Sequence, residues 1–348
     1  MHTPPFDERT LGQIQTLLDS AQCAPDPMQR EFLAEIIRAA LQLGRDGAGT
    51  GEMKLMAKSV RELRHALNVF RPYRGRRKIS VFGSARTPPN HPDYACARDF
   101  CAAMARRGWM SITGAGPGIM CAGNEGAGPG NSFGLSIKLP WETNENEFLR
   151  GDPKLIVFRY FFTRKLMFAM GADAMAVFPG GFGTMDECFE LLTLIQTGKS
   201  PLVPVVFLAG GDSGYWNAFE AFAREHLLSQ GLIDGLDMRL FRSFRDVEDA
   251  AAYVERFYRV YHSSRFVDRL LAIRIRRPLT ADQLDEVNAG FGDLCVRGRI
   301  AQGPALPAED DWLDLPRLTL EFDRKHYSKL RLLLDMLNGF DPPDPAAS

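Results

Sequence analysis

The sequence predicts an α/β protein, a doubly wound parallel sheet with an N-terminal helical extension and a small C-terminal α+β addition. Three observations lead to this fold class. Short apolar runs alternate with helical patterns between residues 78 and 261. The runs are continuous rather than alternating, as in strands buried on both faces. Several of them end in short glycine-rich loops, as strands do where they turn into helices.

The composition is that of an ordinary globular chain. Of its 348 residues, 45% are hydrophobic and 24% are charged, and the formal net charge is -1. A balanced charge gives no reason to expect nucleic acid or an anionic membrane as partner. The six cysteines form no C-x-x-C pair, and the six histidines are scattered. We therefore expect reduced thiols, a cytoplasmic location, and neither a metal nor a cofactor.

The chain is expected to divide into four parts. Residues 1–75 form a helical extension, in which apolar residues such as Leu11, Ile14 and Leu18 recur at helical spacing. The basic run 71–78 that ends it is interpreted as a solvated linker, with a nucleic-acid patch as the alternative. Residues 76–261 form the nucleotide-binding catalytic domain, and residues 262–339 a small α+β region. The tail 340–348 is expected to be disordered.

The central part contains six candidate strands separated by helical patterns. The strands are expected at 79–82, 109–113, 132–139, 155–159, 174–178 and 202–208. The main helices are expected at 93–107, 117–127, 161–171, 184–197 and 245–261. The C-terminal region is expected to follow a strand–helix–strand–helix order, at 270–275, 280–291, 315–322 and 326–337.

Three glycine-rich loops follow predicted strands and open predicted helices. They begin at Gly83-Ser84, at Gly114, and at Pro179. Glycine lets the backbone approach a ligand, and free N–H groups at a helix start favour an anion. Parallel strands bring such loops to one edge of the sheet, which indicates a phosphate or nucleotide site. The alternative is that all three are simply tight strand-to-helix turns.

Two common nucleotide motifs are missing. A dinucleotide fingerprint G-x-G-x-x-G would need glycine at position 119 or 186, where Ile119 and Asp186 stand. A phosphate-binding loop of nucleoside triphosphatases would need glycine at position 193, which is Thr193. The loops therefore favour a smaller phosphate ligand.

The run after Pro179 allows two interpretations. Thr184 and Glu187 match the S/T-x-x-E capping box, in which both would only stabilise a helix start. Alternatively Thr184 helps to hold a phosphate and Glu187 faces the sugar. Glu190, one turn further on, is either a second site carboxylate or a residue that orients a basic neighbour. Arg164 and Lys165 are candidates for ligand binding, with a surface basic pair as the alternative.

Together these residues resemble the Lonely Guy family of cytokinin-activating enzymes. That family carries P-G-G-x-G-T-x-x-E, found here from Pro179 to Glu187, and an R-K helix matched by Arg164-Lys165. A second glycine loop matches from Gly114 to Met120, except that Ala115 replaces a glycine. The resemblance covers about residues 76–261 and implies a Rossmann-like fold.

The resemblance implies hydrolysis of the N-glycosidic bond of a nucleoside 5′-monophosphate, AMP or an N6-modified AMP, to free base and ribose 5-phosphate. It assigns catalysis to Arg164 and Glu187, and it implies a homodimer or larger assembly. Relatives are often labelled lysine decarboxylases. The alternative function is a nucleotide-binding sensor without hydrolysis. The substrate-binding residues are expected to be Gly83, Ser84, Gly114, Gly116, Gly118, Met120, Lys165, Gly180, Gly181, Gly183 and Thr184.

Overall fold

The computed structural model describes residues 6–22, 26–138, 146–211 and 214–341. The chain divides into two compact units, Met1–Arg64 and His65–Ser348. Among the described residues no helix is long and apolar enough to cross a membrane. The predicted disordered tail lies almost entirely outside the described residues.

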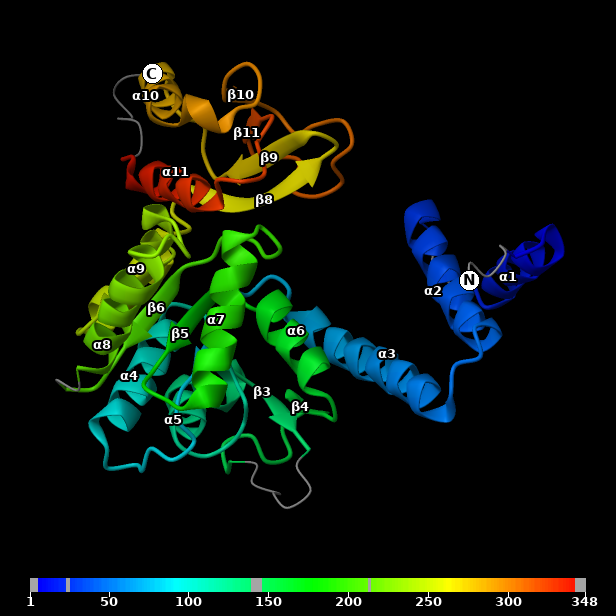
Figure 1. Ribbon diagram of the computed structural model, residues 1–348, viewed down its shortest axis with the longest axis horizontal. Coiled ribbons are helices and arrows are strands. Elements are labelled where there is room, and N and C mark those ends of the chain that lie inside the picture. The colour runs from blue at the N-terminus through cyan, green and yellow to red at the C-terminus, as the bar shows by residue number, and fades with distance from the viewer. Residues whose placement is uncertain (1–5, 23–25, 139–145, 212–213, 342–348) are drawn as a thin grey trace. The chain divides into compact units, whose positions relative to one another are not determined.

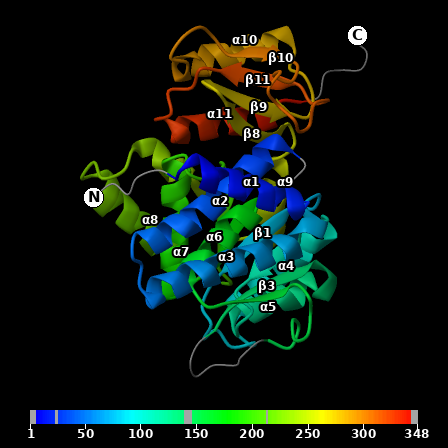
Figure 2. The same cartoon turned by 90° about the vertical axis from the view of Figure 1, so that its right-hand side faces the viewer.

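The first unit is helical, as the sequence predicts. It contains α1 (Glu8–Ser20), α2 (Pro27–Arg45) and most of α3 (Thr50–Phe70). Figure 2 shows α1 beside α2, and the two pack through a small core around Ile14, Leu18 and Ala34. Asp7 and Asp26 cap the two helices by accepting a backbone N–H.

The second unit is built on a seven-stranded parallel sheet, which confirms the predicted fold class. The strand order is β4-β3-β2-β1-β5-β6-β7. The strands are β1 (Lys78–Phe82), β2 (Met110–Thr113), β3 (Ser132–Ile137), β4 (Leu155–Phe158), β5 (Ala174–Val177), β6 (Val205–Leu208) and β7 (Phe241–Phe244). The chain runs outward from β1 to β4 and then returns to the other side of β1. The order therefore reverses between β1 and β5, where α/β sheets bind ligands.

Helices cover both faces of this sheet (Figure 1). The helices are α4 (Pro92–Arg106), α5 (Ile119–Ala127), α6 (Phe161–Gly171), α7 (Phe182–Gln196), α8 (Tyr215–Phe222) and α9 (Val247–Arg256). Three short 3-10 helices are η1 (Arg71–Tyr73), η2 (Pro129–Asn131) and η4 (Gly235–Arg239), and η3 (Ala223–Leu228) is a short π-helix. The predicted helix at 184–197 starts two residues earlier, at Phe182, which matters for the site below.

The interpretation of residues 71–78 as a solvated linker holds for the exposed residues 71, 72, 74 and 75 but not for the end of the run. Lys78 is buried at the start of β1, where its Nζ donates to the carbonyls of Tyr73 and Arg76 at 2.7 Å each. Arg77 pairs with Asp173 at 3.0 Å, and its guanidinium lies 3.4 Å from the centre of the Tyr258 ring. These cations are therefore satisfied inside the fold, and burial lowers the pKa of Lys78.

The C-terminal region forms a four-stranded antiparallel sheet of order β10-β11-β9-β8, with two more strands than predicted. Its elements are β8 (Tyr261–Val267), β9 (Leu270–Ile275), α10 (Ala281–Phe291), η5 (Gly292–Leu294), β10 (Ala301–Gly303), β11 (Arg317–Leu320) and α11 (Tyr327–Gly339). The segment between β10 and β11 is anchored by buried Glu309. This carboxylate pairs with Arg274 at 2.8 Å and with Arg317 at 2.9 Å.

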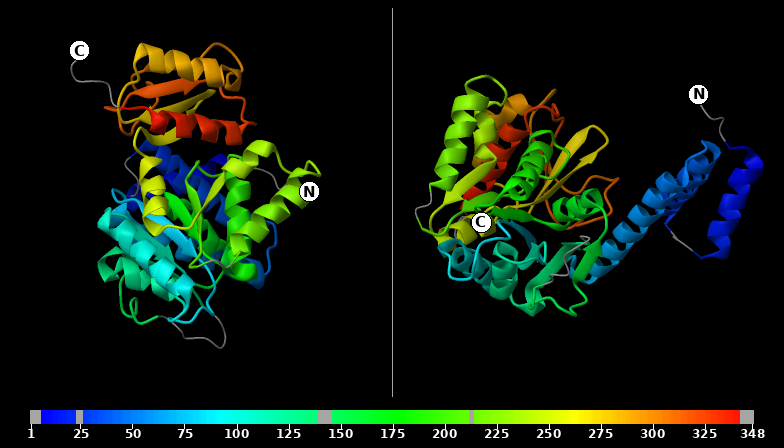
Figure 3. Two further views of the ribbon diagram at one scale, coloured as in Figure 1. Left: turned by 90° about the vertical axis from the view of Figure 1, so that its left-hand side faces the viewer. Right: turned by 60° about the horizontal axis from the view of Figure 1, so that its bottom comes forward.

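Helix α11 joins this region to the parallel sheet. Figure 3 shows α11 on the side of the small sheet that faces the seven-stranded one. Its Arg331 is fully buried and donates to the Val203 carbonyl at 3.2 Å and to the Tyr253 hydroxyl at 2.5 Å. Asn338 accepts the backbone N–H groups of Val260 and Tyr261. Residues 262–339 thus complete the core of the second unit, while the predicted domain limits stay predictions.

Candidate functional site

A cleft of about 820 Å³ lies at the carboxyl ends of β1, β2 and β5. This is the crevice where the strand order reverses. The described residues that line it come from the three glycine-rich loops and from the starts of α6 and α7. They are Phe82, Gly83, Ser84, Ala85, Arg86, Gly114, Met120, Phe161, Arg164, Gly180, Gly181, Phe182, Gly183, Thr184, Met185, Asp186 and Glu187.

In the first two loops, the fold itself requires several of the glycines. A Cβ atom at Gly83 would meet the Ile119 side chain at 2.6 Å, and one at Gly114 would meet Nη2 of Arg164 at 2.5 Å. Gly118 has a φ of +66°, and a Cβ atom there would lie 2.3 Å from the Ser84 carbonyl. The alternative interpretation, tight turns, therefore explains these glycines. They also bring the loops after β1 and β2 into direct contact, since Ile119 N–H donates to the Ser84 carbonyl at 3.0 Å.

The third loop is different, because the fold does not require two of its glycines. A Cβ atom at Gly180 would meet Thr184 Oγ1 at 2.1 Å, but one at Gly181 or Gly183 would meet nothing within 4 Å. Gly183 lies inside α7, where glycine costs about 1 kcal/mol relative to alanine. No close packing at Gly183 accounts for this cost. A ligand that approaches the backbone there would explain why the residue is glycine.

The start of α7 is not the predicted capping box. The N-cap is Gly181, and no side chain caps the helix. Thr184 is inside the first turn and buried, so it does not act as a cap, and Glu187 stands one turn further on. The first N–H groups of the helix therefore have no intrahelical partner, which is the arrangement that binds an anion. Tyr215 supports the loop by donating its hydroxyl to the Gly180 carbonyl at 2.7 Å.

Glu187 and Arg164 lie together in the cleft. Burial raises the pKa of Glu187 to about 7, and the positive charges of Lys165 and Arg164 only partly oppose this rise. Arg164 is held by a hydrogen bond from its Nε to the Leu135 carbonyl at 2.8 Å, and burial lowers its pKa while Glu187 opposes that change. A carboxyl group that titrates near neutral pH beside a fixed guanidinium is typical of a catalytic site.

Lys165 does not line the cleft, contrary to the expectation that it contacts the ligand. Its Nζ pairs with Asp186 at 2.8 Å and with Glu190 at 2.9 Å. Burial disfavours its charge, but these two hydrogen bonds raise the pKa of Lys165 overall. Glu190 therefore orients a basic neighbour, as one of the two sequence interpretations holds. Lys165 in turn fixes α6 against α7, the helices that carry Arg164 and Glu187.

Most predicted site residues come together, with a few exceptions. Gly116, Gly118 and Lys165 are the predicted residues that do not line the cleft; the two glycines instead shape the second loop. The sequence interpretation missed the aromatic wall of Phe161 and Phe182, whose side chains are 55% and 98% exposed. The available sequence signal for Phe182 was a large aromatic residue at the variable position of P-G-G-x-G-T.

The described residues contain no group of three or more histidine, cysteine or acidic side chains placed to hold a metal ion. Among the described residues that line the cleft there is also no lysine. A lysine is what pyridoxal phosphate needs to form its Schiff base, so the cleft does not fit that cofactor.

One family model matches part of the chain. Residues 119–254 match the family described as "Possible lysine decarboxylase", and this segment contains Arg164 and Glu187. None of the curated proteins compared with the sequence matches it.

Several solved structures are similar to about half of this chain at low identity. A molybdenum cofactor binding protein from Rippkaea orientalis is 20% identical, with a TM-score of 0.38, covering 52% of this chain and 96% of that one. The molybdenum cofactor carrier protein of Chlamydomonas reinhardtii is 22% identical, with a TM-score of 0.37, covering 52% and 97%. DNA processing protein A from Helicobacter pylori is 13% identical, with a TM-score of 0.37, covering 52% and 80%. Likenesses this distant do not identify a ligand.

Proposed function

We propose that this chain, which resembles the Lonely Guy family and matches the family described as "Possible lysine decarboxylase" over residues 119–254, hydrolyses the N-glycosidic bond of a nucleoside 5′-monophosphate. The products would be a free base and ribose 5-phosphate. AMP and N6-modified AMP are the first substrates to test. The observation that carries the proposal is the first two turns of α7, which join an uncapped, glycine-containing helix start to the half-buried carboxyl group of Glu187.

The 5′-phosphate would bind at the start of α7. The unpaired N–H groups and the helix dipole favour a dianion there, and Gly181 and Gly183 leave room for it. Ser84 and Arg86 line the same cleft from the loop after β1 and can donate to the remaining phosphate oxygens. One helical turn separates Thr184 from Glu187, so a sugar attached to this phosphate would extend towards the carboxyl group.

Bond cleavage would depend on Glu187. When the bond between C1′ and the base nitrogen breaks, positive charge develops at C1′, as in other glycoside hydrolyses. The ionised carboxylate stabilises that charge and takes a proton from the water molecule whose oxygen adds to C1′. The leaving base receives a proton from solvent. Arg164 would hold the ribose phosphate so that C1′ faces Glu187.

The aromatic wall would accommodate the base. Phe161 and Phe182 expose their rings at the edge of the cleft, where a purine can stack on them. A lysine decarboxylase is a poorer fit, because the described lining residues offer no lysine for a Schiff base and because Lys165 is paired with two carboxylates.

A product assay tests the proposal. The purified protein is incubated with AMP, GMP, CMP, UMP and isopentenyl-AMP, and both ribose 5-phosphate and free base are measured. We expect equal amounts of the two products from at least one nucleotide. Glu187→Gln should remove this activity, while the matched control Glu190→Gln, whose carboxylate bonds to Lys165, should retain most of it. Tight nucleotide binding without products would instead support a sensor.

A further inference from the structure

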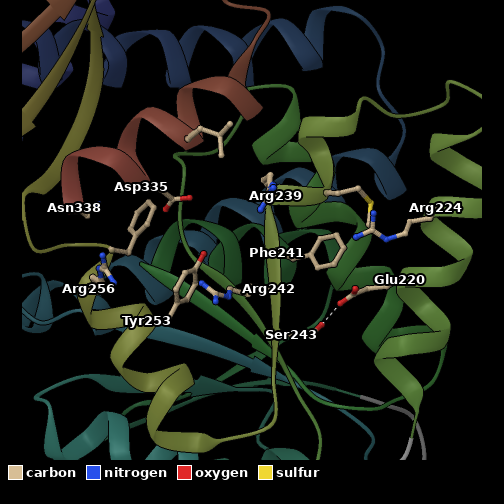
Figure 4. Close-up of a pocket in the computed structure, with 13 residues that line it drawn as sticks. Glu220, Arg224, Arg239, Phe241, Arg242, Ser243, Tyr253, Arg256, Asp335 and Asn338 are labelled. Carbon is tan, nitrogen blue, oxygen red and sulfur yellow. Dashed lines mark hydrogen bonds between the residues drawn. The ribbon is translucent and has the colours of Figure 1, made fainter. Parts of the chain in front are cut away.

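A second pocket, of about 540 Å³, lies at the β7 edge of the seven-stranded sheet (Figure 4). It is built around the start of β7 and closed by η3, η4, α9 and α11. It shares no lining residue with the cleft. Since ligands of parallel sheets bind at the carboxyl ends of strands, a pocket at the amino end of an edge strand is separate from the proposed catalytic site.

The charge of this pocket is positive. Four arginines line it, each from a different element: Arg224 from η3, Arg239 from η4, Arg242 from β7 and Arg256 from α9. All four are exposed, and within the described part of the chain none of their side chains forms an ion pair or a hydrogen bond.

Two carboxylates, Glu220 and Asp335, also line the pocket but have other partners. Glu220 accepts a hydrogen bond from the Ser243 hydroxyl at 2.6 Å, and Asp335 accepts one from the buried Arg331 at 3.1 Å. Four arginines against two carboxylates leave the lining with a net charge of +2.

Within the described chain, no ion pair to these four arginines offsets their charge. Like charges gathered in one concave site repel one another, with water screening part of the repulsion because all four side chains are exposed. Only Arg242 has a structural contact, since its guanidinium lies 5.4 Å from the centre of the Tyr253 ring and 5.3 Å from that of Phe244. A bound anion would neutralise these positive charges and remove the repulsion between them.

We propose that this pocket binds a small molecule that carries two or more phosphate groups. One guanidinium group can donate two parallel hydrogen bonds to a phosphate group. Four guanidinium groups from separate elements can therefore surround several phosphates at once. The volume is in the range of small-molecule sites. The phenyl ring of Phe241 and the phenol ring of Tyr253 supply an apolar wall beside the charges (Figure 4). The proposal does not depend on the catalytic function.

Titration calorimetry with inorganic tripolyphosphate tests the site. The catalytic cleft is kept occupied by excess ribose 5-phosphate, and inorganic phosphate and a twenty-residue thymidine oligonucleotide are titrated for comparison. The pocket variant is Arg224→Gln combined with Arg239→Gln, because both side chains are exposed and free of contacts within the described chain. The control is Arg269→Gln combined with Arg297→Gln, two exposed arginines outside the pocket with the same loss of charge.

We expect tripolyphosphate to bind wild type and control alike, inorganic phosphate to bind more weakly, and the pocket variant to lose at least about tenfold in affinity. Three outcomes would overturn the proposal: no binding to wild type, an equal loss in the pocket variant and the control, or tighter binding of the oligonucleotide than of tripolyphosphate. Circular dichroism melting checks that both variants fold, and Arg239→Gln alone replaces the double variant should it be unstable.

Discussion

Replacing Glu187 with glutamine is expected to stabilise the folded protein at alkaline pH while it removes turnover. Burial disfavours the ionised form of this carboxyl group and raises its pKa from 4.5 to about 7. Between pH 4.5 and about pH 7, Glu187 is ionised in the unfolded chain but still protonated in the folded protein. The free energy of unfolding therefore falls as pH rises through this window, and the deficit is complete above pH 7.

The size of the effect follows from the two pKa values. At about 1.36 kcal/mol for each pKa unit, a rise from 4.5 to about 7 corresponds to a deficit of about 3 kcal/mol at pH 8. Glutamine has nearly the same shape and no charge, so Glu187→Gln should recover most of this energy at pH 8. Most of the difference should vanish at pH 5, where wild-type Glu187 is protonated in the folded protein.

Urea unfolding at pH 5 and pH 8 measures the free energy of unfolding of wild type, Glu187→Gln and the control Glu190→Gln. The control should gain nothing at pH 8, because Glu190 pairs with Lys165 at 2.9 Å and its loss removes an attraction. An equal gain of Glu187→Gln at both pH values would refute the reasoning, since the glutamine would then stabilise by packing. So would no gain at pH 8, because the carboxylate would then be well solvated.

Four further outcomes are expected. The kcat/KM for the best nucleotide should rise with pH through about 7 as Glu187 ionises, measured between pH 5 and 9; a decline over this range would assign the protonated form as the active one. Gly183→Ala should raise the free energy of unfolding by about 0.5–1 kcal/mol and raise KM at least about tenfold, measured by urea unfolding and initial rates; an unchanged KM would mean that no ligand approaches this backbone. AMP should be cleaved and adenosine should not, and equal kcat/KM for the two would refute a phosphate site at α7. Arg331→Ala should lower the free energy of unfolding by about 3 kcal/mol, because it leaves the Val203 carbonyl and Asp335 without their partner; a loss under about 0.5 kcal/mol would mean that these hydrogen bonds contribute little to stability.

Local patterns predicted the six central strands because each is a continuous apolar run between helical segments. They missed β7. In this strand only Phe241 is buried, while Arg242, Ser243 and Phe244 are exposed or partly exposed. An edge strand needs few apolar residues, and its four-residue length gives no periodicity to detect. The two extra strands of the C-terminal sheet were missed for the same reason, since β8 is buried only at its two ends.

The site was predictable where a motif fixed it and not where the fold assembled it. The run from Gly180 to Glu187 is contiguous, so its glycines and carboxyl group could be named. Its capping was misread because an S/T-x-x-E pattern cannot show whether the helix starts at the threonine or before it; here Gly181 is the N-cap. The pairing of Lys165 with Asp186 and Glu190 depends on how α6 lies against α7, which no local pattern encodes.

The arginine-lined pocket lies beyond local prediction altogether. Arg224, Arg239, Arg242 and Arg256 come from four elements, and each alone is an ordinary exposed arginine. Only the tertiary structure brings them to one concavity. The same holds for the buried group of Glu309, Arg274 and Arg317, whose members come from a loop and two strands.

The most direct test of the proposed chemistry is a product assay on isotopically labelled nucleotide. AMP labelled in the ribose is incubated with wild type and with Glu187→Gln at pH 8, and ribose 5-phosphate and adenine are quantified. The proposal predicts one ribose 5-phosphate for each adenine from wild type, and a rate at least about 100-fold lower from the variant. Should both proteins release adenine at rates within a factor of about two, Glu187 would not be the catalytic carboxylate.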